Sequence, residues 1–147
     1  MVATKILSEY YWIQESTLGG KQRNFLWRID EQYNLYIKRS ASEKVEMFTE
    51  ESLDKIHNYI SENEWIDLAN NVAKLGKDEE KDGLGKFIYE NINKDIAYAQ
   101  LASQVGAIFT SVDIWVCNGK KINIKFRIAS NEWKNTITDY YSGKIIT

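Results

Sequence analysis

Apolar and polar residues alternate along the first third of the chain, as they do in strands that bury one face. A side-chain period of two is typical of β-strands, and turn residues such as Gly19-Gly20 separate the alternating segments. The pattern predicts an N-terminal antiparallel meander of three strands, beginning with residues 8–16. The inward side chains are expected to be Phe25, Trp27, Ile29, Tyr33, Leu35 and Ile37.

Helical spacing replaces this alternation after a polar connector at residues 40–48. Thr49 is a good N-cap for a helix at residues 50–61, because its side-chain oxygen can accept a hydrogen bond from a free amide of the first turn. The apolar spacing of three and four residues predicts further helices at 65–75, 84–92 and 95–111. A closing helix at 131–141 is predicted to be capped by Ser130 and stopped by Gly143.

A β-hairpin is predicted at residues 112–128, with its turn at Asn118-Gly119. A two-residue loop would place apolar residues opposite polar ones. If Gly119 is instead a bulge at the end of a three-residue loop, Ile114 faces Ile122 and Val112 faces Ile124. Because a one-residue slip inverts the faces of a strand, this second register is the expected one.

The expected register places Trp115 on the outer face of the hairpin among polar and cationic side chains. Tryptophan and arginine dominate the energetics of many protein interfaces. The alternative is that Trp115 is covered by the closing helix. The candidate binding residues are Trp115, Lys121, Asn123, Lys125 and Arg127.

These elements together predict a single α+β domain over residues 1–147. Residues 1–48 form the β-rich part, and residues 49–147 form a helical part that contains the hairpin at 112–128. Three helices followed by a hairpin is the order found in winged-helix modules. In that interpretation the 95–111 helix would enter the DNA major groove, although it offers few side chains suited to reading bases.

Composition limits the classes of function. The chain has 147 residues, 44% of them hydrophobic, and a formal net charge of −2, which does not describe a strongly basic nucleic-acid binder. Its single cysteine, Cys117, excludes an internal disulfide and a zinc site built from several cysteines. We expect a soluble cytoplasmic protein, with no signal peptide, no membrane contact and no cofactor.

Three catalytic patterns were considered, and none is well formed. His57 is predicted to be an exposed or half-buried helix residue that nothing places near Cys117. Gly83 to Lys86 lacks the spacing of a phosphate-binding loop and is predicted to be the turn at the start of a helix. A metal-dependent nuclease would use Asp113 with Asn123 and Lys125, but an amide is a poor substitute for a carboxylate ligand of Mg²⁺.

The sequence therefore predicts a small non-catalytic protein that binds another protein, as a regulator, inhibitor or adaptor does. A winged-helix-like nucleic-acid-binding protein is the alternative, and a divalent-metal-dependent nuclease is a distant third. The outer face of the hairpin is the predicted binding surface. The partner's identity and the oligomeric state are left open.

Overall fold

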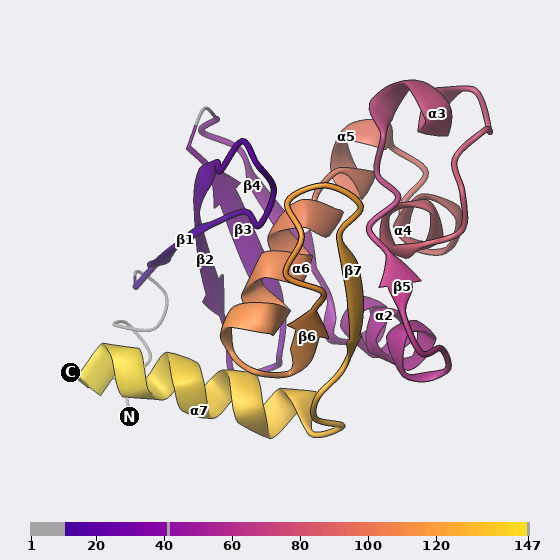
Figure 1. Ribbon diagram of the computed structural model, residues 1–147. Coiled ribbons are helices and arrows are strands. Elements are labelled where there is room, and N and C mark those ends of the chain that lie inside the picture. The colour runs from indigo at the N-terminus through magenta and orange to yellow at the C-terminus, as the bar shows by residue number, and fades with distance from the viewer. Residues whose placement is uncertain (1–10, 41, 147) are drawn as a thin grey trace.

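The computed structural model describes residues 11–40 and 42–146 and shows an α+β fold, as predicted (Figure 1). A four-stranded antiparallel sheet comes first in the chain, and helices and a smaller three-stranded sheet follow it. The first sheet contains β1 (Ile13–Ser16), β2 (Asn24–Ile29), β3 (Leu35–Arg39) and β4 (Val45–Phe48), each paired with the next.

The predicted meander is present in this first sheet and has one strand more than expected. Five of the expected inward side chains on β2 and β3 are buried: Phe25, Trp27, Ile29, Leu35 and Ile37. Tyr33 lies instead in the turn before β3, with a φ of 65°. The first predicted strand is present from Ile13, and its residues 8–10 lie outside the described part of the chain.

The fourth strand, β4, lies in the segment that was predicted to be a polar connector. Its residues do not alternate as in the other strands, because Val45 and Met47 face outward with 44% and 41% of their surface exposed. Glu46 pairs with the buried Ile37 and takes the inward parity, and only Phe48 is both apolar and buried. A strand with one apolar residue on its inward face gives no alternating pattern, so the sequence did not reveal it.

The helices at residues 50–61 and 84–92 form where they were predicted. In α2 (Glu50–Ser61) the Thr49 hydroxyl accepts a hydrogen bond from the Ser52 amide at 3.1 Å. Gly83 starts α4 (Leu84–Asn91), and Leu84 and Ile88 are buried. Helix α2 is specified by its cap and its apolar spacing, and α4 by its apolar spacing.

The predicted helix at 65–75 is wrong. Residues Ile66–Asp67 form a short strand, β5, and only Val72–Gly76 are helical, as α3. Ile66 pairs with Phe126, which is 60 positions away in the sequence. Ala69 has a φ of 47° between the two elements, which a continuous helix does not allow.

The predicted 95–111 helix is present as two pieces, α5 (Ile96–Ala99) and α6 (Ala102–Ser111). The Asp95 side chain caps the first piece by accepting a hydrogen bond from the Tyr98 amide at 3.0 Å. Helix α6 lies between the two sheets (Figure 1). Its Gly106 allows the Phe126 ring to approach closely, since an added Cβ would lie 2.4 Å from that ring.

Helix α6 ends in a Schellman motif that decides which way the next strand faces. The Ile114 amide donates to the Phe109 carbonyl at 2.9 Å, and the Asp113 amide donates to the Thr110 carbonyl at 3.1 Å. Asp113 takes the left-handed conformation that this motif requires, with a φ of 64°. The chain then enters β6 (Trp115–Cys117) with Trp115 directed inward.

The hairpin forms in a different register from the predicted one. Strand β6 pairs with β7 (Lys125–Ile128) so that Trp115 faces Ile128 and Cys117 faces Phe126. Residues 118–124 form a long loop, with Gly119 and Asn123 at φ of 77° and 58°. Ile122, expected to be inward, is 77% exposed in this loop. The three-stranded sheet has the order β5-β7-β6.

Helix α7 (Trp133–Ile146) closes the fold and is longer than predicted, because it continues through Gly143. It runs along the lower edge of the molecule in Figure 1 and packs on β2. The Trp133 indole donates to Asp54 of α2 at 2.8 Å. One cluster of buried apolar side chains includes residues of both sheets, of α2 and of the helices from α4 to α7.

Candidate functional site

The structure corrects the placement of Trp115, the central residue of the predicted binding surface. Trp115 is 1% exposed, and its ring centroid lies 4.7 Å from that of Phe109 and 5.6 Å from that of Phe126. Its indole nitrogen donates to Nδ1 of His57 at 3.2 Å. In the observed register of β6 and β7, the Trp115 side chain points into the core. Trp115 is therefore a packing residue and not an exposed anchor.

The other four predicted residues divide into two pairs. Lys121 and Asn123 lie in the hairpin loop and not on a strand, and both are exposed. Lys125 and Arg127 alternate outward on β7, as predicted. The Lys125 ammonium lies 3.2 Å from the Asp67 carboxylate on the neighbouring strand β5.

A different tryptophan, Trp65, occupies the outer face beside Arg127. The Arg127 guanidinium carbon lies 5.1 Å from the centroid of a Trp65 ring, and Arg127 pairs directly with Val116 of β6. Trp65 and Val116 are 38% and 39% exposed, which is high for large apolar side chains. We call the group Trp65, Val116, Lys125 and Arg127 the Trp65–Arg127 face.

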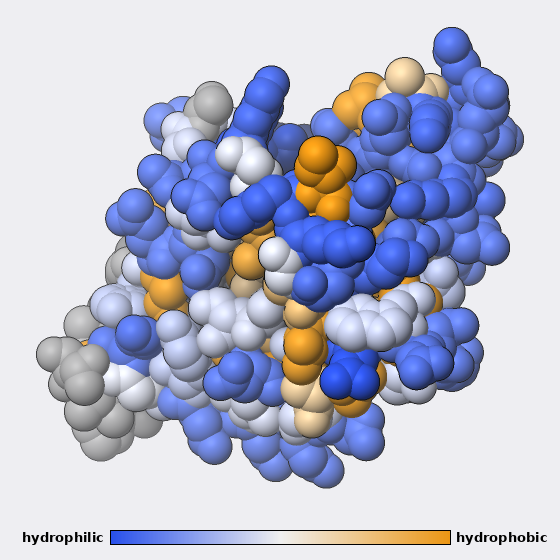
Figure 2. All heavy atoms as spheres, viewed as in Figure 1, coloured by the Kyte–Doolittle hydropathy of each residue, from blue (hydrophilic) through white to orange (hydrophobic). Residues whose placement is uncertain are grey.

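Figure 2 shows this side of the molecule with weakly polar and hydrophobic atoms directly beside strongly hydrophilic ones over the three-stranded sheet. The sequence did not reveal Trp65 as a surface residue, because its spacing to Leu68 and Val72 also fits a helix. Only the pairing of Ile66 with Phe126 places Trp65 next to Arg127. That pairing leaves no local signal in the sequence.

The residues considered for nucleophilic catalysis have other roles. His57 is 5% exposed, contrary to the expected surface position, and burial lowers the pKa of its imidazole although Asp54 lies close enough to oppose the shift. Because Nδ1 accepts the Trp115 hydrogen bond, the neutral ring carries its proton on Nε2. The Cys117 sulfur accepts a hydrogen bond from the Gly119 amide at 3.4 Å.

The residues considered for phosphate or metal binding are also explained by packing. A Cβ on Gly85 would lie 2.4 Å from the Ala69 carbonyl oxygen, so this glycine permits a close backbone contact at the start of α4. Asp113 terminates α6, and Lys125 is engaged by Asp67. The described residues contain no group of three or more His, Cys, Asp or Glu side chains that could hold a metal ion.

The helix that a winged-helix module would insert into DNA is part of the core here. Seven of the ten residues of α6 are buried, including Gln104, which was one of its few candidate base-reading side chains. The first of the three expected helices is replaced by β5 and α3. The hairpin loop also contacts the β1–β2 loop, since a Cβ on Gly19 would lie 3.9 Å from the Lys121 carbonyl oxygen.

No protein-family model, curated protein or solved structure matches this chain. Within the described residues, none of the helices has the length and apolar character needed to cross a bilayer.

Proposed function

We propose that this protein acts in the cytoplasm by binding another protein, without catalysis, through the Trp65–Arg127 face. The observation that carries the proposal is the exposed Trp65 ring with the Arg127 guanidinium 5.1 Å from its centroid. Tryptophan and arginine are enriched among the residues that dominate interface energies. Here the two side chains are already held together before a partner arrives.

The scaffold under this face supports the proposal because it is rigid. Arg127 lies on β7, and Trp65 directly precedes β5. The inward residues of these two paired strands, Phe126 and Ile66, belong to the buried core. A binding residue on a packed strand or directly beside one loses less conformational entropy on association than one in a long loop. The exposed Val116 on the other side of Arg127 extends the apolar contact area.

Charge indicates the kind of partner. The Lys125 ammonium is partly neutralised by Asp67, which also lies 3.4 Å from Lys81. Arg127, in contrast, forms no ion pair with any described residue. A partner with a carboxylate next to an apolar or aromatic side chain would therefore complement this face, with the carboxylate on Arg127 and the apolar group on Trp65.

Affinity purification with tagged protein from a lysate of the source organism tests the proposal, with nuclease-treated and untreated samples side by side. Wild type should retain a nuclease-resistant protein partner. With the purified partner, Trp65→Ala and Arg127→Ala should each weaken binding by about tenfold or more, as expected for hot-spot residues. Circular dichroism of each variant checks that it remains folded.

The matched control is the double variant Val45→Ala, Met47→Ala. These two side chains have similar exposure, 44% and 41%, but lie on the outer face of the four-stranded sheet. The control should bind the partner within about twofold of wild type. The proposal fails if the control loses the partner while the Trp65 and Arg127 variants keep it. Recovery of nucleic acid alone would favour nucleic-acid binding instead.

A further inference from the structure

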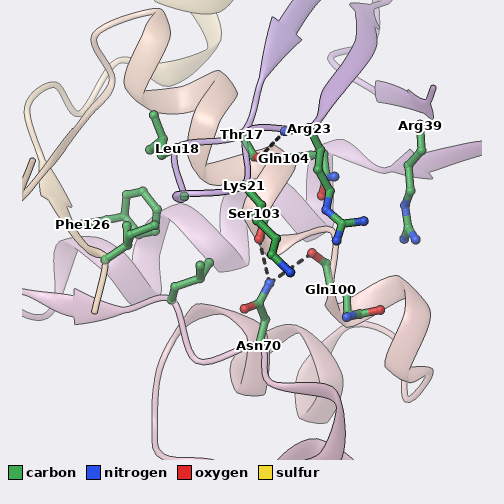
Figure 3. A pocket seen from close by; sticks show the side chains of 13 residues that line it. Thr17, Leu18, Lys21, Arg23, Arg39, Asn70, Gln100, Ser103, Gln104 and Phe126 are labelled. Carbon is green, nitrogen blue, oxygen red and sulfur yellow. Dashed lines mark hydrogen bonds between the residues drawn. The ribbon is translucent and has the colours of Figure 1, made fainter. Parts of the chain in front are cut away.

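A cavity of about 330 Å³ lies at the junction of the two sheets (Figure 3). Its walls come from the β1–β2 loop, the end of β3, the segment after β5, the start of α6 and strand β7. This volume is within the range of sites that bind small molecules. The cavity is separate from the Trp65–Arg127 face, because neither Trp65 nor Arg127 lines it.

Three cationic side chains line the cavity, and no carboxylate does: Lys21, Arg23 and Arg39. In Figure 3 they extend from the sheet side toward Asn70 and Gln100 on the opposite side. Among the ion pairs of residues 11–40 and 42–146, none uses any of these three cations, whereas several other lysines of the chain are paired with carboxylates. Arg39 donates to the Ala97 carbonyl oxygen at 2.5 Å, which is a neutral acceptor, so the charge of all three side chains remains available to an anionic ligand.

The uncharged polar side of the cavity is held in place by hydrogen bonds. The Asn70 amide donates to the Ser103 hydroxyl at 2.8 Å and to the Gln100 carbonyl at 3.2 Å. Gln104 also lines the cavity, but its Oε1 is buried beneath the cavity surface, so a ligand would meet the rest of this side chain.

The remaining wall is apolar and suits the body of an organic molecule. Leu68, Ile124 and Phe126 line it, and Phe126 is fixed in the core against Trp115. An inorganic anion would contact the cations but would leave this apolar surface unused. The wall therefore favours a ligand with a ring attached to its anionic group.

We propose that this cavity binds a small phosphate monoester whose body is a ring. Lys21, Arg23 and Arg39 would hold the phosphate, because three cations match a dianion better than a single carboxylate. Leu68 and Phe126 would contact the apolar surface of the ring. A nucleoside monophosphate has both of these features.

Isothermal titration calorimetry at low ionic strength tests this site with uridine monophosphate and phenyl phosphate as probes. Both should bind saturably with one site per chain. Inorganic phosphate, uridine and orotate should each bind at least about tenfold more weakly than uridine monophosphate. Inorganic phosphate lacks the ring, and uridine lacks the charged group. Orotate is an anionic ring compound with a carboxylate and no phosphate.

The double variant Lys21→Gln, Arg23→Gln should weaken binding of uridine monophosphate by about tenfold or more. Lys44→Gln with Lys55→Gln removes the same charge at exposed lysines that do not line the cavity, and should leave the dissociation constant within about twofold.

Three results would overturn the proposal. If neither phosphate ester binds saturably, the cavity is not a phosphate-ester site. If the Lys44/Lys55 control weakens binding as much as the Lys21/Arg23 double variant does, the binding is non-specific charge attraction. Orotate binding as tightly as uridine monophosphate would contradict the phosphate assignment. None of these results depends on whether the Trp65–Arg127 face binds a protein.

Discussion

At the scale of single residues, the hydrogen bond between Trp115 and His57 ties α2 to β6. The two residues are 58 positions apart in the sequence, and both are almost completely buried. The imidazole must remain neutral to accept from the indole on Nδ1, while its Nε2 is buried without a partner in the described structure. Protonation would place a charge in the core that nearby Asp54 only partly offsets, which explains why burial lowers the His57 pKa.

This arrangement predicts an acid-sensitive fold. Because the folded pKa of His57 lies below its unfolded value of about 6.5, the unfolded chain takes up the proton first as the pH falls. The stabilisation that His57 provides is complete above this value and is lost as the pH falls through it toward the folded pKa. The free energy of unfolding should therefore decrease between about pH 7.5 and 5.5, by at most about 1.4 kcal/mol per pH unit for one proton.

Urea denaturation across this range measures the effect, with His57→Gln as the comparison. Glutamine can still accept a hydrogen bond from Trp115 but does not titrate. The variant should show a flatter dependence on pH than wild type. If both proteins lose stability in parallel, groups other than His57 control the acid sensitivity.

The sequence predicted which residues of the first sheet face inward, but it did not predict the orientation of Trp115. Inward residues such as Phe25 and Leu35 are set by alternation within a single strand, and they were identified correctly. The face of Trp115 depends on the left-handed turn at Asp113 and on a seven-residue hairpin loop, residues 118–124. Neither feature follows from alternation, and this is why Trp115 was placed outside and Trp65 was overlooked.

At the scale of elements, glycine has opposite effects in two helices: it permits close packing in α6 and weakens α7. Gly106 lies against Phe126 of β7, and an added Cβ would be 2.4 Å from the ring. Gly143 lies within α7, where an added Cβ would meet no atom of the described residues within 4 Å outside its own helix backbone and chain neighbours. Alanine has the higher helix propensity at either position, so the surroundings decide the sign of the change.

The two substitutions should have opposite effects on stability. Gly106→Ala should lower the free energy of unfolding by roughly 1–3 kcal/mol, because the fixed Phe126 ring would have to move. Gly143→Ala should raise it by roughly 0.5–1 kcal/mol. Denaturant unfolding of both variants measures these changes.

A second-site change tests the cause that is assigned to Gly106. Phe126→Leu shortens the facing side chain, so Gly106→Ala should cost less in that background than in wild type. If the cost is the same in both backgrounds, the contact with Phe126 is not the source of the destabilisation.

Elements specified by local signals were predicted well, and those specified by distant pairing were not. The cap at Thr49 and the apolar spacing of α2 lie within the element itself, so both of its ends were correct. Strand β5 is only two residues long and exists because it pairs with β7. No pattern within residues 65–75 distinguishes it from a helix, and the element order that resembled a winged helix was lost with it.

At the scale of the whole molecule, the two sheets share one apolar core. Helix α6 lies between them (Figure 1), and helix α7 connects the β-rich and helical parts through contacts with both. Trp133 of α7 bonds to Asp54 on α2, and Tyr141 donates to the Tyr11 carbonyl at 2.6 Å beside the four-stranded sheet. These contacts join residues 79 and 130 positions apart.

A shared core predicts that the whole chain unfolds as one cooperative unit, as the sequence-based expectation of a single domain also requires. Tryptophans lie in both parts, with Trp27 in the first sheet and Trp115 in the second. Denaturation curves followed by tryptophan fluorescence and by far-ultraviolet circular dichroism should therefore coincide. Trp133→Phe, which removes the bond to Asp54, should shift both curves together by about 1 kcal/mol. Two separate transitions, with only one of them displaced in the variant, would mean that the sheets belong to independently folding units and that α7 stabilises only its own side.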